Sequence, residues 1–225
     1  MNKKRIVILH LIACLLTLSS LDNHIIAQKS YDRYEYEPEK YKAIGGNIYV
    51  GYGLLTGNIS DYFTNTFLSG FNVDFYRQRM VFQIDGHLGF GITEETMVFT
   101  QDSGWEDNKL ALHVNLGGNF GYRLVDTESI KIVPLAGIGL GGITPLPLNS
   151  YKVDKPLFPY FNLGCYIDLK FLKFFKPYLI FSDDDYYSCV RLSFGIKHQI
   201  GKRKYDSFYQ GNMIYFTIGF AGSQE

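Results

Sequence analysis

A strict alternation of apolar with polar or small residues runs through residues 110–124. Every even position except Gly118 is apolar or aromatic, and every odd position is small or polar. Successive side chains of a β-strand point to opposite faces, so this period-two pattern predicts a strand with one apolar face. The segment is also much longer than the usual strand of about 5–6 residues. A long β-strand with two chemically different faces is therefore the first element that we expect.

The same alternation recurs along the chain and separates long connections from short ones. It marks seven further segments, which are residues 44–54, 67–75, 80–90, 130–140, 161–171, 190–196 and 214–220. The long polar connections are residues 55–66, 93–108, 142–157 and 201–211, and the tight turns are residues 77–79 and 125–128. Long loops at one end and short turns at the other are typical of antiparallel hairpins around a barrel. We predict an all-β, eight-stranded antiparallel up-and-down transmembrane β-barrel.

Residues 172–187 do not fit eight strands simply, because they should form a short turn. Within them, residues 177–181 (PYLIF) read as a further strand. Single-chain bacterial barrels have even numbers of strands, so a ninth strand would require a tenth, for which residues 31–36 are a candidate. Ten strands therefore remain the alternative to eight.

The composition of the two faces predicts which one meets lipid. One face contains Leu, Ile, Val and Phe without any Lys, Arg, Asp or Glu, and the other is rich in Gly, Asn, Ser and Tyr. A water-facing sheet surface would carry more Lys, Glu and Thr and less strand-weakening Gly, whereas small residues suit a narrow barrel interior. We expect lipid outside, with interfacial aromatics at Tyr41, Tyr52, Tyr76, Phe90, Tyr122, Phe158 and Phe171. A secreted soluble ligand-binding barrel, with the faces exchanged, is the alternative.

The N-terminus has the layout of a secretory signal peptide. A basic start is followed by an apolar run at residues 6–18 and by a small residue, Ala27, at the expected cut. A lipobox-like sequence at Cys14 and a membrane anchor are competing interpretations, and lipidation stays open. We predict a signal peptide at residues 1–27, a mobile periplasmic arm at 28–40 and the barrel at 41–225. After Ala27 no apolar run is long enough for a transmembrane helix.

Residues 41–220 resemble the small outer-membrane β-barrels of the OmpX/OmpA type that are common in the Bacteroidota. The resemblance rests on the signal peptide, the eight alternating strands and a last strand, IYFTIGF, that ends in an aromatic residue. It implies export to the outer membrane of a Gram-negative bacterium, and contact with outer-membrane lipid and lipopolysaccharide. It also implies recognition of Phe216, Ile218 and Phe220 by the barrel-assembly machinery. The tail AGSQE after Phe220 departs from that pattern.

Ionisable residues on the polar face are predicted to form a paired network inside the lumen, since buried charges require partners. They are Asp74, Asp85, His87, His113, Arg123, Lys131, Asp168, Lys170, Arg191 and Lys197. Barrel enzymes that modify lipid A use a His, a Ser and an acid, which Asp85, His87 and Ser193 could supply. None of those enzymes' local motifs is recognised here, so a structural network is preferred to a catalytic site.

Other motifs point to no cofactor and no metal. Residues 183–185 (DDD) lack the spaced ligands of a calcium loop, and the glycines at 137–142 are not followed by a helix that could bind phosphate. Cys165 and Cys189 are expected to be small buried residues, and a disulfide between them stays open. The balance of 22 basic and 22 acidic residues excludes a basic nucleic-acid footprint.

The resulting expectation is a non-enzymatic integral outer-membrane barrel with a structural, adhesive or envelope role. Its long loops would lie at the cell surface, where their partner is not identified by the sequence. The oligomeric state is not identified either. A lipid-modifying barrel enzyme is the functional alternative.

Overall fold

A computed structural model describes residues 42–100, 103–146, 157–173, 186–201 and 206–224. Contacts separate Tyr41–Glu225 as one compact unit, to which all described elements belong. Eight long strands build it: β1 (Lys42–Thr56), β2 (Thr66–Arg77), β3 (Met80–Ile92), β6 (Leu110–Tyr122), β8 (Ile130–Pro145), β9 (Leu157–Lys173), β10 (Tyr186–Gln199) and β11 (Gly211–Gln224). Five short elements accompany them: α2 (Ile59–Tyr62), β4 (Met97–Thr100), β5 (Ser103–Trp105), β7 (Val125–Asp126) and α3 (Asp206–Tyr209).

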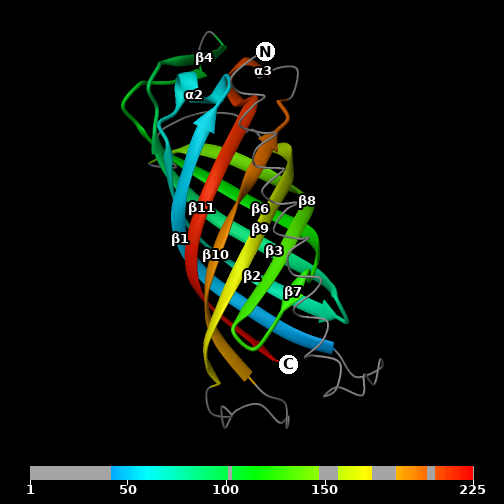
Figure 1. Cartoon of the computed structure of the whole chain (residues 1–225). Coiled ribbons are helices and arrows are strands. Elements are labelled where there is room, and N and C mark those ends of the chain that lie inside the picture. Colours follow the sequence, from blue (N-terminus) through cyan, green and yellow to red (C-terminus); the bar gives the residue numbers. More distant parts are fainter. Residues whose placement is uncertain (1–41, 101–102, 147–156, 174–185, 202–205, 225) are drawn as a thin grey trace, which may run out of the picture. The chain divides into compact units, whose positions relative to one another are not determined.

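Each long strand pairs in antiparallel fashion with its neighbours in the sequence, and β1 pairs with β11 to close the sheet. In the registers, Tyr52 of β1 lies opposite Phe67 of β2 on one side and Phe216 of β11 on the other. The result is a closed eight-stranded up-and-down barrel (Figure 1). The predicted fold class is confirmed. Closure pairs the backbone groups of every long strand, which is the arrangement that a lipid surrounding requires.

The two ends of the barrel differ. The cap end carries α2, the β4–β5 hairpin and α3, and the opposite turn end carries the short β2–β3 turn, β7 and the C-terminal end of β11 (Figure 1). Three of the connections that were expected to be long and polar thus contain short regular elements. They are residues 55–66, 93–108 and 201–211. β8 also continues to Pro145, beyond the expected end at residue 140. The predicted signal peptide, the arm and residues 177–181 and 183–185 lie outside the described residues.

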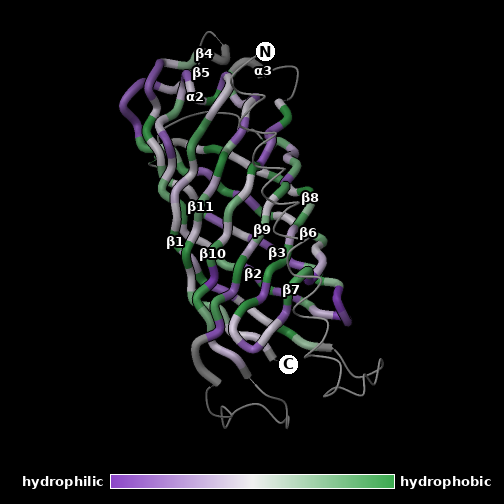
Figure 2. Tube along the Cα trace, viewed as in Figure 1, coloured by the Kyte–Doolittle hydropathy of each residue, from purple (hydrophilic) through white to green (hydrophobic). Residues whose placement is uncertain are grey.

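The apolar face of the wall points outward. Ile48 and Phe220 are 75% and 76% exposed, whereas Tyr49, the residue after Ile48, is 6% exposed. Hydrophobic and hydrophilic residues alternate along the strands in Figure 2. Soluble monomers rarely expose contiguous apolar surface of more than a few hundred Å², and strands of 12 to 17 residues exceed the ~10 needed to cross a bilayer. The barrel is therefore a transmembrane one, with the opposite facing to that of a soluble ligand-binding barrel.

Neither of the two helices in the described ranges is long and apolar enough to cross a membrane.

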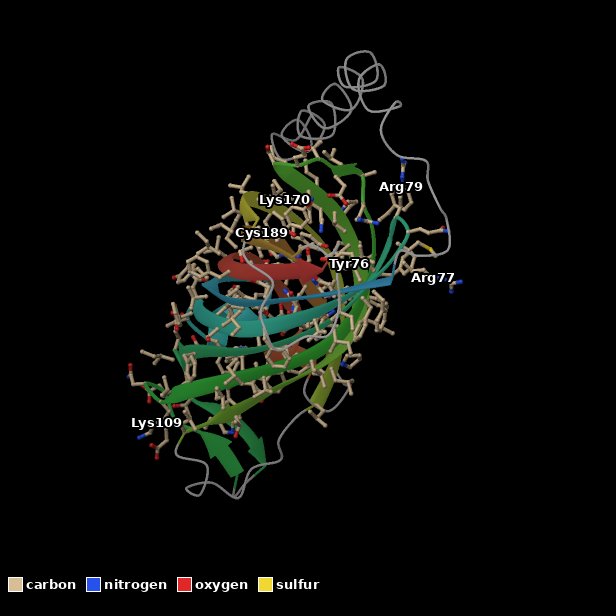
Figure 3. The ribbon with its side chains drawn as sticks, turned by 90° about the horizontal axis from the view of Figure 1, so that it is seen from below. Tyr76, Arg77, Arg79, Lys109, Lys170 and Cys189 are labelled. Atoms are coloured by element: carbon tan, nitrogen blue, oxygen red, sulfur yellow. The ribbon has the colours of Figure 1, made fainter. Side chains whose placement is uncertain are left out.

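Two of the seven aromatic residues assigned to interfacial girdles point inward instead. Tyr76 and Phe158 are 4% and 2% exposed, because their positions share the parity of the polar face in β2 and β9. In the view from the turn end, Tyr76 lies within the barrel and Arg77 extends away from the wall (Figure 3). Tyr52, Phe90 and Tyr122 are exposed on the outside, as predicted. The side chains of Tyr41 and Phe171 fall outside the described part.

Inward tyrosines lie over glycines of neighbouring strands. A Cβ atom added at Gly117 of β6 or at Gly139 of β8 would collide with the ring and hydroxyl of Tyr160. Gly164 and Gly195, on β9 and β10, stand in the same relation to the hydroxyl of Tyr215. Only glycine leaves room for a flat ring at such close approach. Tyr160 and Tyr215 are thus accommodated in the lumen by four glycines of the neighbouring strands.

Candidate functional site

The ten ionisable residues predicted to face the lumen all belong to the inward face of the described wall. Nine are buried residues, and the side chain of the tenth, Lys170, is 4% exposed. They divide along the barrel axis into a group at the turn end, a group around Arg191, a group around Lys197, and His113 towards the cap end. The predicted residues are Asp74, Asp85, His87, His113, Arg123, Lys131, Asp168, Lys170, Arg191 and Lys197.

Arg191 of β10 is the centre of the lower group. Its guanidinium donates two hydrogen bonds to Asp168 of β9, Nε to Oδ1 at 2.6 Å and Nη2 to Oδ2 at 2.8 Å. Nη1 donates across the lumen to Asp74 Oδ2 at 2.5 Å and to Asn72 Oδ1 at 3.0 Å, both on β2. The ring of Tyr166 lies 3.8 Å below the guanidinium carbon. A cation held by two carboxylates and an aromatic face is well compensated for its burial.

A ladder of amides continues from this group towards the cap end. Gln83 donates to Asp74 at 2.8 Å, Asn119 to Gln83 at 3.0 Å, and Asn162 to Asn119 at 2.8 Å. The hydroxyl of Tyr215 donates to Asn162 Oδ1 at 3.1 Å. Each amide both donates and accepts, so the ladder crosses from β3 through β6 and β9 to β11 with its groups satisfied. It ties opposite walls of the barrel together.

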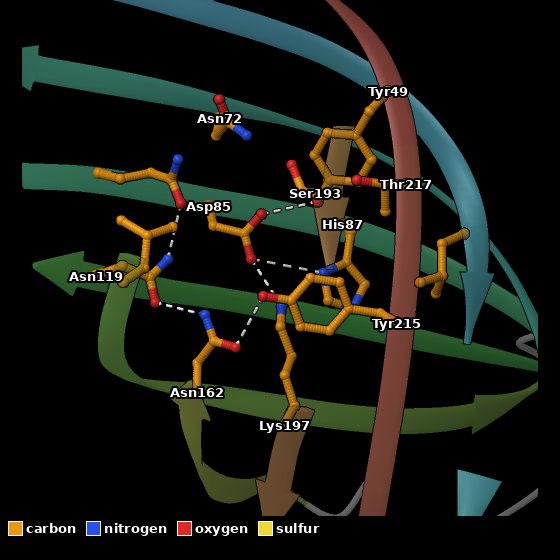
Figure 4. Close-up of a pocket in the computed structure, with 13 residues that line it drawn as sticks. Tyr49, Asn72, Asp85, His87, Asn119, Asn162, Ser193, Lys197, Tyr215 and Thr217 are labelled. Atoms are coloured by element: carbon orange, nitrogen blue, oxygen red, sulfur yellow. Dashed lines mark hydrogen bonds and ion pairs between the residues drawn. The ribbon is translucent and has the colours of Figure 1, made fainter. Parts of the chain in front are cut away.

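Lys197 is the centre of the upper group. Its Nζ donates to Asp85 Oδ2 at 2.7 Å and lies 3.0 Å from Nδ1 of His87. The hydroxyl of Tyr49 donates to the other oxygen of Asp85 at 2.7 Å. A polar cavity of about 30 Å³ adjoins these groups and is also lined by Ser193. Figure 4 shows Asp85, His87 and Lys197 converging on it. The cavity is large enough for about one or two water molecules.

At the turn end, Asp126 holds two bases together. Arg123 Nη1 donates to Asp126 Oδ2 at 2.6 Å, and Lys170 Nζ donates to Asp126 Oδ1 at 2.8 Å. Arg123 also donates to the carbonyl oxygen of Gln78 in the β2–β3 turn. Lys131 Nζ lies 3.4 Å from Ser223 Oγ, which places the end of β11 in the wall of the lumen. This group fixes the two neighbouring turns to each other.

An apolar plug closes the lumen at the cap end, and the sequence patterns did not reveal it. Trp105 and Tyr209 come from β5 and α3 and are each 1% exposed. Phe63 packs edge-on against Trp105, with ring centroids 5.9 Å apart, and stacks on Tyr209 at 6.2 Å. The full plug consists of Leu55, Ile59, Phe63, Leu68, Met97, Trp105, Ala111, Ile143, Phe158, Tyr209, Met213 and Tyr215. Seven of its members are inward residues at the cap ends of the long strands, and the other five, Ile59, Phe63, Met97, Trp105 and Tyr209, come from the connections, where no period marks them.

The alternative catalytic set does not form a nucleophile–base pair in the described residues. Asp85 is bound by Lys197 and Tyr49, and its carboxylate lies 3.7 Å from His87 Nδ1. Ser193 lines the same cavity, but no hydrogen bond joins it to His87 among the described side chains. The set also faces the lumen, whereas lipid substrates surround the outer face.

Metal and disulfide chemistry find no support in the described segments. No group of three or more His, Cys, Asp or Glu side chains there is placed to hold a metal ion. Cys165 and Cys189 are both free thiols. Cys189 lies on the inward face, whereas Cys165 shares the parity of the lipid-facing residues of β9, so the wall of the barrel separates them.

The predicted assembly-signal residues lie on the outside of β11. Phe216, Ile218 and Phe220 are 55%, 53% and 76% exposed. The tail after Phe220 continues the strand, with Ser223 paired to Gly45 of β1 and to Tyr187 of β10. The departure from the family pattern is thus a longer strand, and the aromatic residue lies inside it.

No protein-family model matches the chain, and a search of curated protein sequences finds no match. Among solved structures, the chain is similar to Neisserial surface protein A, at 8% identity and a TM-score of 0.42, over 81% of this chain and 96% of that one. It is also similar to the outer membrane protein AlkL, solved in lipid bilayers, at 11% identity and a TM-score of 0.32, over 81% and 89% of the two chains. At these identities, functional conclusions depend on the geometry of this chain.

Proposed function

We propose that this protein is an integral outer-membrane β-barrel with a structural, adhesive or other envelope role, and that its cap end is displayed at the cell surface. The observation that carries the proposal is a lumen occluded twice, by the charge network around Arg191 and by the apolar plug. An eight-stranded barrel filled by side chains passes no ordinary solutes. The apolar outer wall supports insertion in lipid, and the two different ends support a fixed orientation.

Fractionation of cells that express the full chain tests the location. The protein is expected in the outer-membrane fraction, soluble only with detergent, and to migrate differently on gels before and after boiling. Recovery from the soluble fraction without detergent would contradict the membrane assignment. Reconstitution in planar bilayers tests the occluded lumen, and stepwise ion conductance of the folded barrel would contradict a purely structural role.

The orientation is tested by cysteine labelling of intact cells with a membrane-impermeant maleimide. The background carries Cys165→Ser and Cys189→Ser. Asp107→Cys places the probe in an exposed position at the cap end, and Glu128→Cys places it in an exposed position at the turn end. Labelling of residue 107 alone is expected, with both positions labelled after lysis. Labelling of residue 128 alone in intact cells would reverse the orientation.

The absence of enzymatic activity is part of this proposal. The engaged carboxylate of Asp85 and its inward position support it. Mass spectrometry of lipid A from cells with and without the protein tests it directly, with identical spectra expected. A change in lipid A that Ser193→Ala abolishes would establish the lipid-modifying alternative. Barrel-assembly machinery and lipopolysaccharide are the proposed partners, and cross-linking of intact cells at the cap end tests for a surface ligand.

A further inference from the structure

Five buried polar atoms on β2, β3, β6 and β9 lie in the lumen near Lys197 and the apolar plug, and Gln199 Oε1 of β10, directly opposite Tyr160, is a sixth. Within the described part of the chain, none of the five has a hydrogen-bond partner. They belong to residues that are at most 5% exposed, on β2, β3, β6 and β9. They are Thr66 Oγ1, His87 Nε2, His113 Nε2, Asn115 Oδ1 and Tyr160 Oη.

The pairing of the strands places these atoms side by side. His87 lies directly opposite Asn115 in the β3–β6 pair, and His113 is the next inward residue of β6 towards the cap. Directly opposite side chains in a sheet have Cβ atoms about 4.5–5.5 Å apart. A Cβ added at Gly89 would meet both Thr66 and His113, and one at Gly117 would meet the Tyr160 hydroxyl. The five groups therefore occupy neighbouring positions on the inner face of the wall.

The contact with Lys197 determines which hydrogen the imidazole of His87 carries. A lysine ammonium group has only donors, so His87 Nδ1, at 3.0 Å from Lys197 Nζ, must accept. The proton of the neutral ring then resides on Nε2, which becomes a donor without an acceptor. Asn115 Oδ1, across the strand pair, is an acceptor without a donor. The two groups are complementary, and one water molecule can satisfy both.

We propose that this layer is a closed hydration chamber, in which a trapped water cluster is bound and one water bridges His87 Nε2–H and Asn115 Oδ1. Buried polar groups in native proteins are almost always partnered, by protein or by ordered water, and such waters typically make about three hydrogen bonds. The cavity of about 30 Å³ lies on the Asp85 side of His87 and is not lined by the other four groups, so the proposal rests on the unpartnered polar atoms themselves.

The chemistry of the layer favours water over a metal ion. An imidazole nitrogen that carries a hydrogen cannot ligate a metal, and the neighbouring ammonium group of Lys197 repels a cation. The plug above and the Arg191 group below leave the chamber without an open route to either end. Waters in it are therefore expected to exchange slowly compared with surface water.

NMR of the full-length barrel in detergent micelles, with ¹⁵N-labelled histidine, tests the proposal. The expected result is a His87 proton on Nε2 that shows a cross-peak to long-lived water. Asn115→Leu should remove this cross-peak and leave the tautomer unchanged. Asn212→Leu is the control, because Asn212 lies outside the lumen on the parity of the outer face. A proton on Nδ1, or a direct contact of Nε2–H with Asn115, would overturn the proposal.

Two further measurements keep the test decisive if Asn115→Leu does not fold. A high-resolution crystal structure of the native barrel should show density for water between His87 and Asn115, and an empty gap there would overturn the chamber. Treatment with a chelator should leave the histidine spectrum unchanged. Loss or shift of the His87 and His113 signals on chelation would show that the layer holds a metal ion instead of water.

Discussion

Arg191 and Asp168 lie directly opposite each other on neighbouring strands and share two parallel hydrogen bonds, of 2.6 and 2.8 Å. The same guanidinium reaches Asp74 on the far wall, at 2.5 Å. The bidentate geometry accounts for the use of arginine, since a lysine ammonium could not bind both oxygens of one carboxylate in this way. The contact between Arg191 and Asp74 joins segments 117 residues apart in the chain, so it forms only when the barrel closes.

Replacement of Arg191 is expected to destabilise the closed barrel strongly. Arg191→Gln leaves two buried carboxylates without their cation, which typically costs about 3–5 kcal/mol. Urea titration of the barrel in lipid vesicles measures the loss. Lys109→Gln is the matched control, because it removes a surface ion pair with Glu106 that contributes about 0–1 kcal/mol. Equal effects of the two substitutions would contradict a supporting role for the lumen network.

The pair of Lys197 and Asp85 is expected to show strong coupling in a double-mutant cycle. Lys197→Met alone leaves the buried Asp85 carboxylate without its cation. Asp85→Asn alone leaves the Lys197 ammonium group and the Tyr49 hydroxyl without the carboxylate that they bind. The double replacement removes both charges, so its cost should fall short of the sum of the single costs by about 0.5–3 kcal/mol. Additive costs in the same urea titration would show that the two side chains do not act together in the folded barrel.

The alternation of residue types predicted eight strands and which residues share a face, and the composition of the two faces predicted that the charged one points inward. Strand parity would also have placed Tyr76 correctly, because Tyr76 shares the parity of Asp74. The girdle assignment of Tyr76 and Phe158 was wrong, because it considered only their positions near strand ends. The sequence did not predict which lumen residues contact each other. Arg191 and Asp74 lie far apart in sequence, and their meeting depends on the registers of all the strands between them.

The apolar plug was missed for a different physical reason. Ile59, Met97, Trp105 and Tyr209 come from three connections, with Met97 and Trp105 in the same one, and their sequence neighbours form no alternating pattern. A periodicity search detects faces of regular elements, whereas a core assembled from loop tips has no period. The antiparallel strand order places these connections at one end of the barrel, and its closure brings their apolar residues together as packing partners.

The neighbouring glycines Gly117 and Gly118 are expected to respond differently to alanine. At Gly117 the added methyl group would strike the Tyr160 hydroxyl, with the Ile138 carbonyl oxygen at 3.0 Å, and overpacking typically costs about 1–3 kcal/mol. At Gly118, which lies on the outer face, the nearest atoms belong to Phe82 at 3.7 Å, an ordinary contact. Tyr160→Phe should restore part of the loss in Gly117→Ala. Thermal unfolding on gels measures all three, and equal shifts for Gly117→Ala and Gly118→Ala would argue against ring-over-glycine packing.

Arginine scanning of the outer wall should reveal a cost that depends on depth. Phe71 lies at the middle of β2 and is 51% exposed, whereas Leu124 follows β6 at the turn end and is 64% exposed. An arginine at the bilayer midplane costs about 2–4 kcal/mol and one near the interface about 0–1 kcal/mol. Phe71→Arg is therefore expected to destabilise the barrel in lipid vesicles much more than Leu124→Arg. In a soluble protein both positions would face water, and the two substitutions would have similarly small effects. The difference between the free-energy costs of the two substitutions therefore shows whether the outer wall lies in lipid.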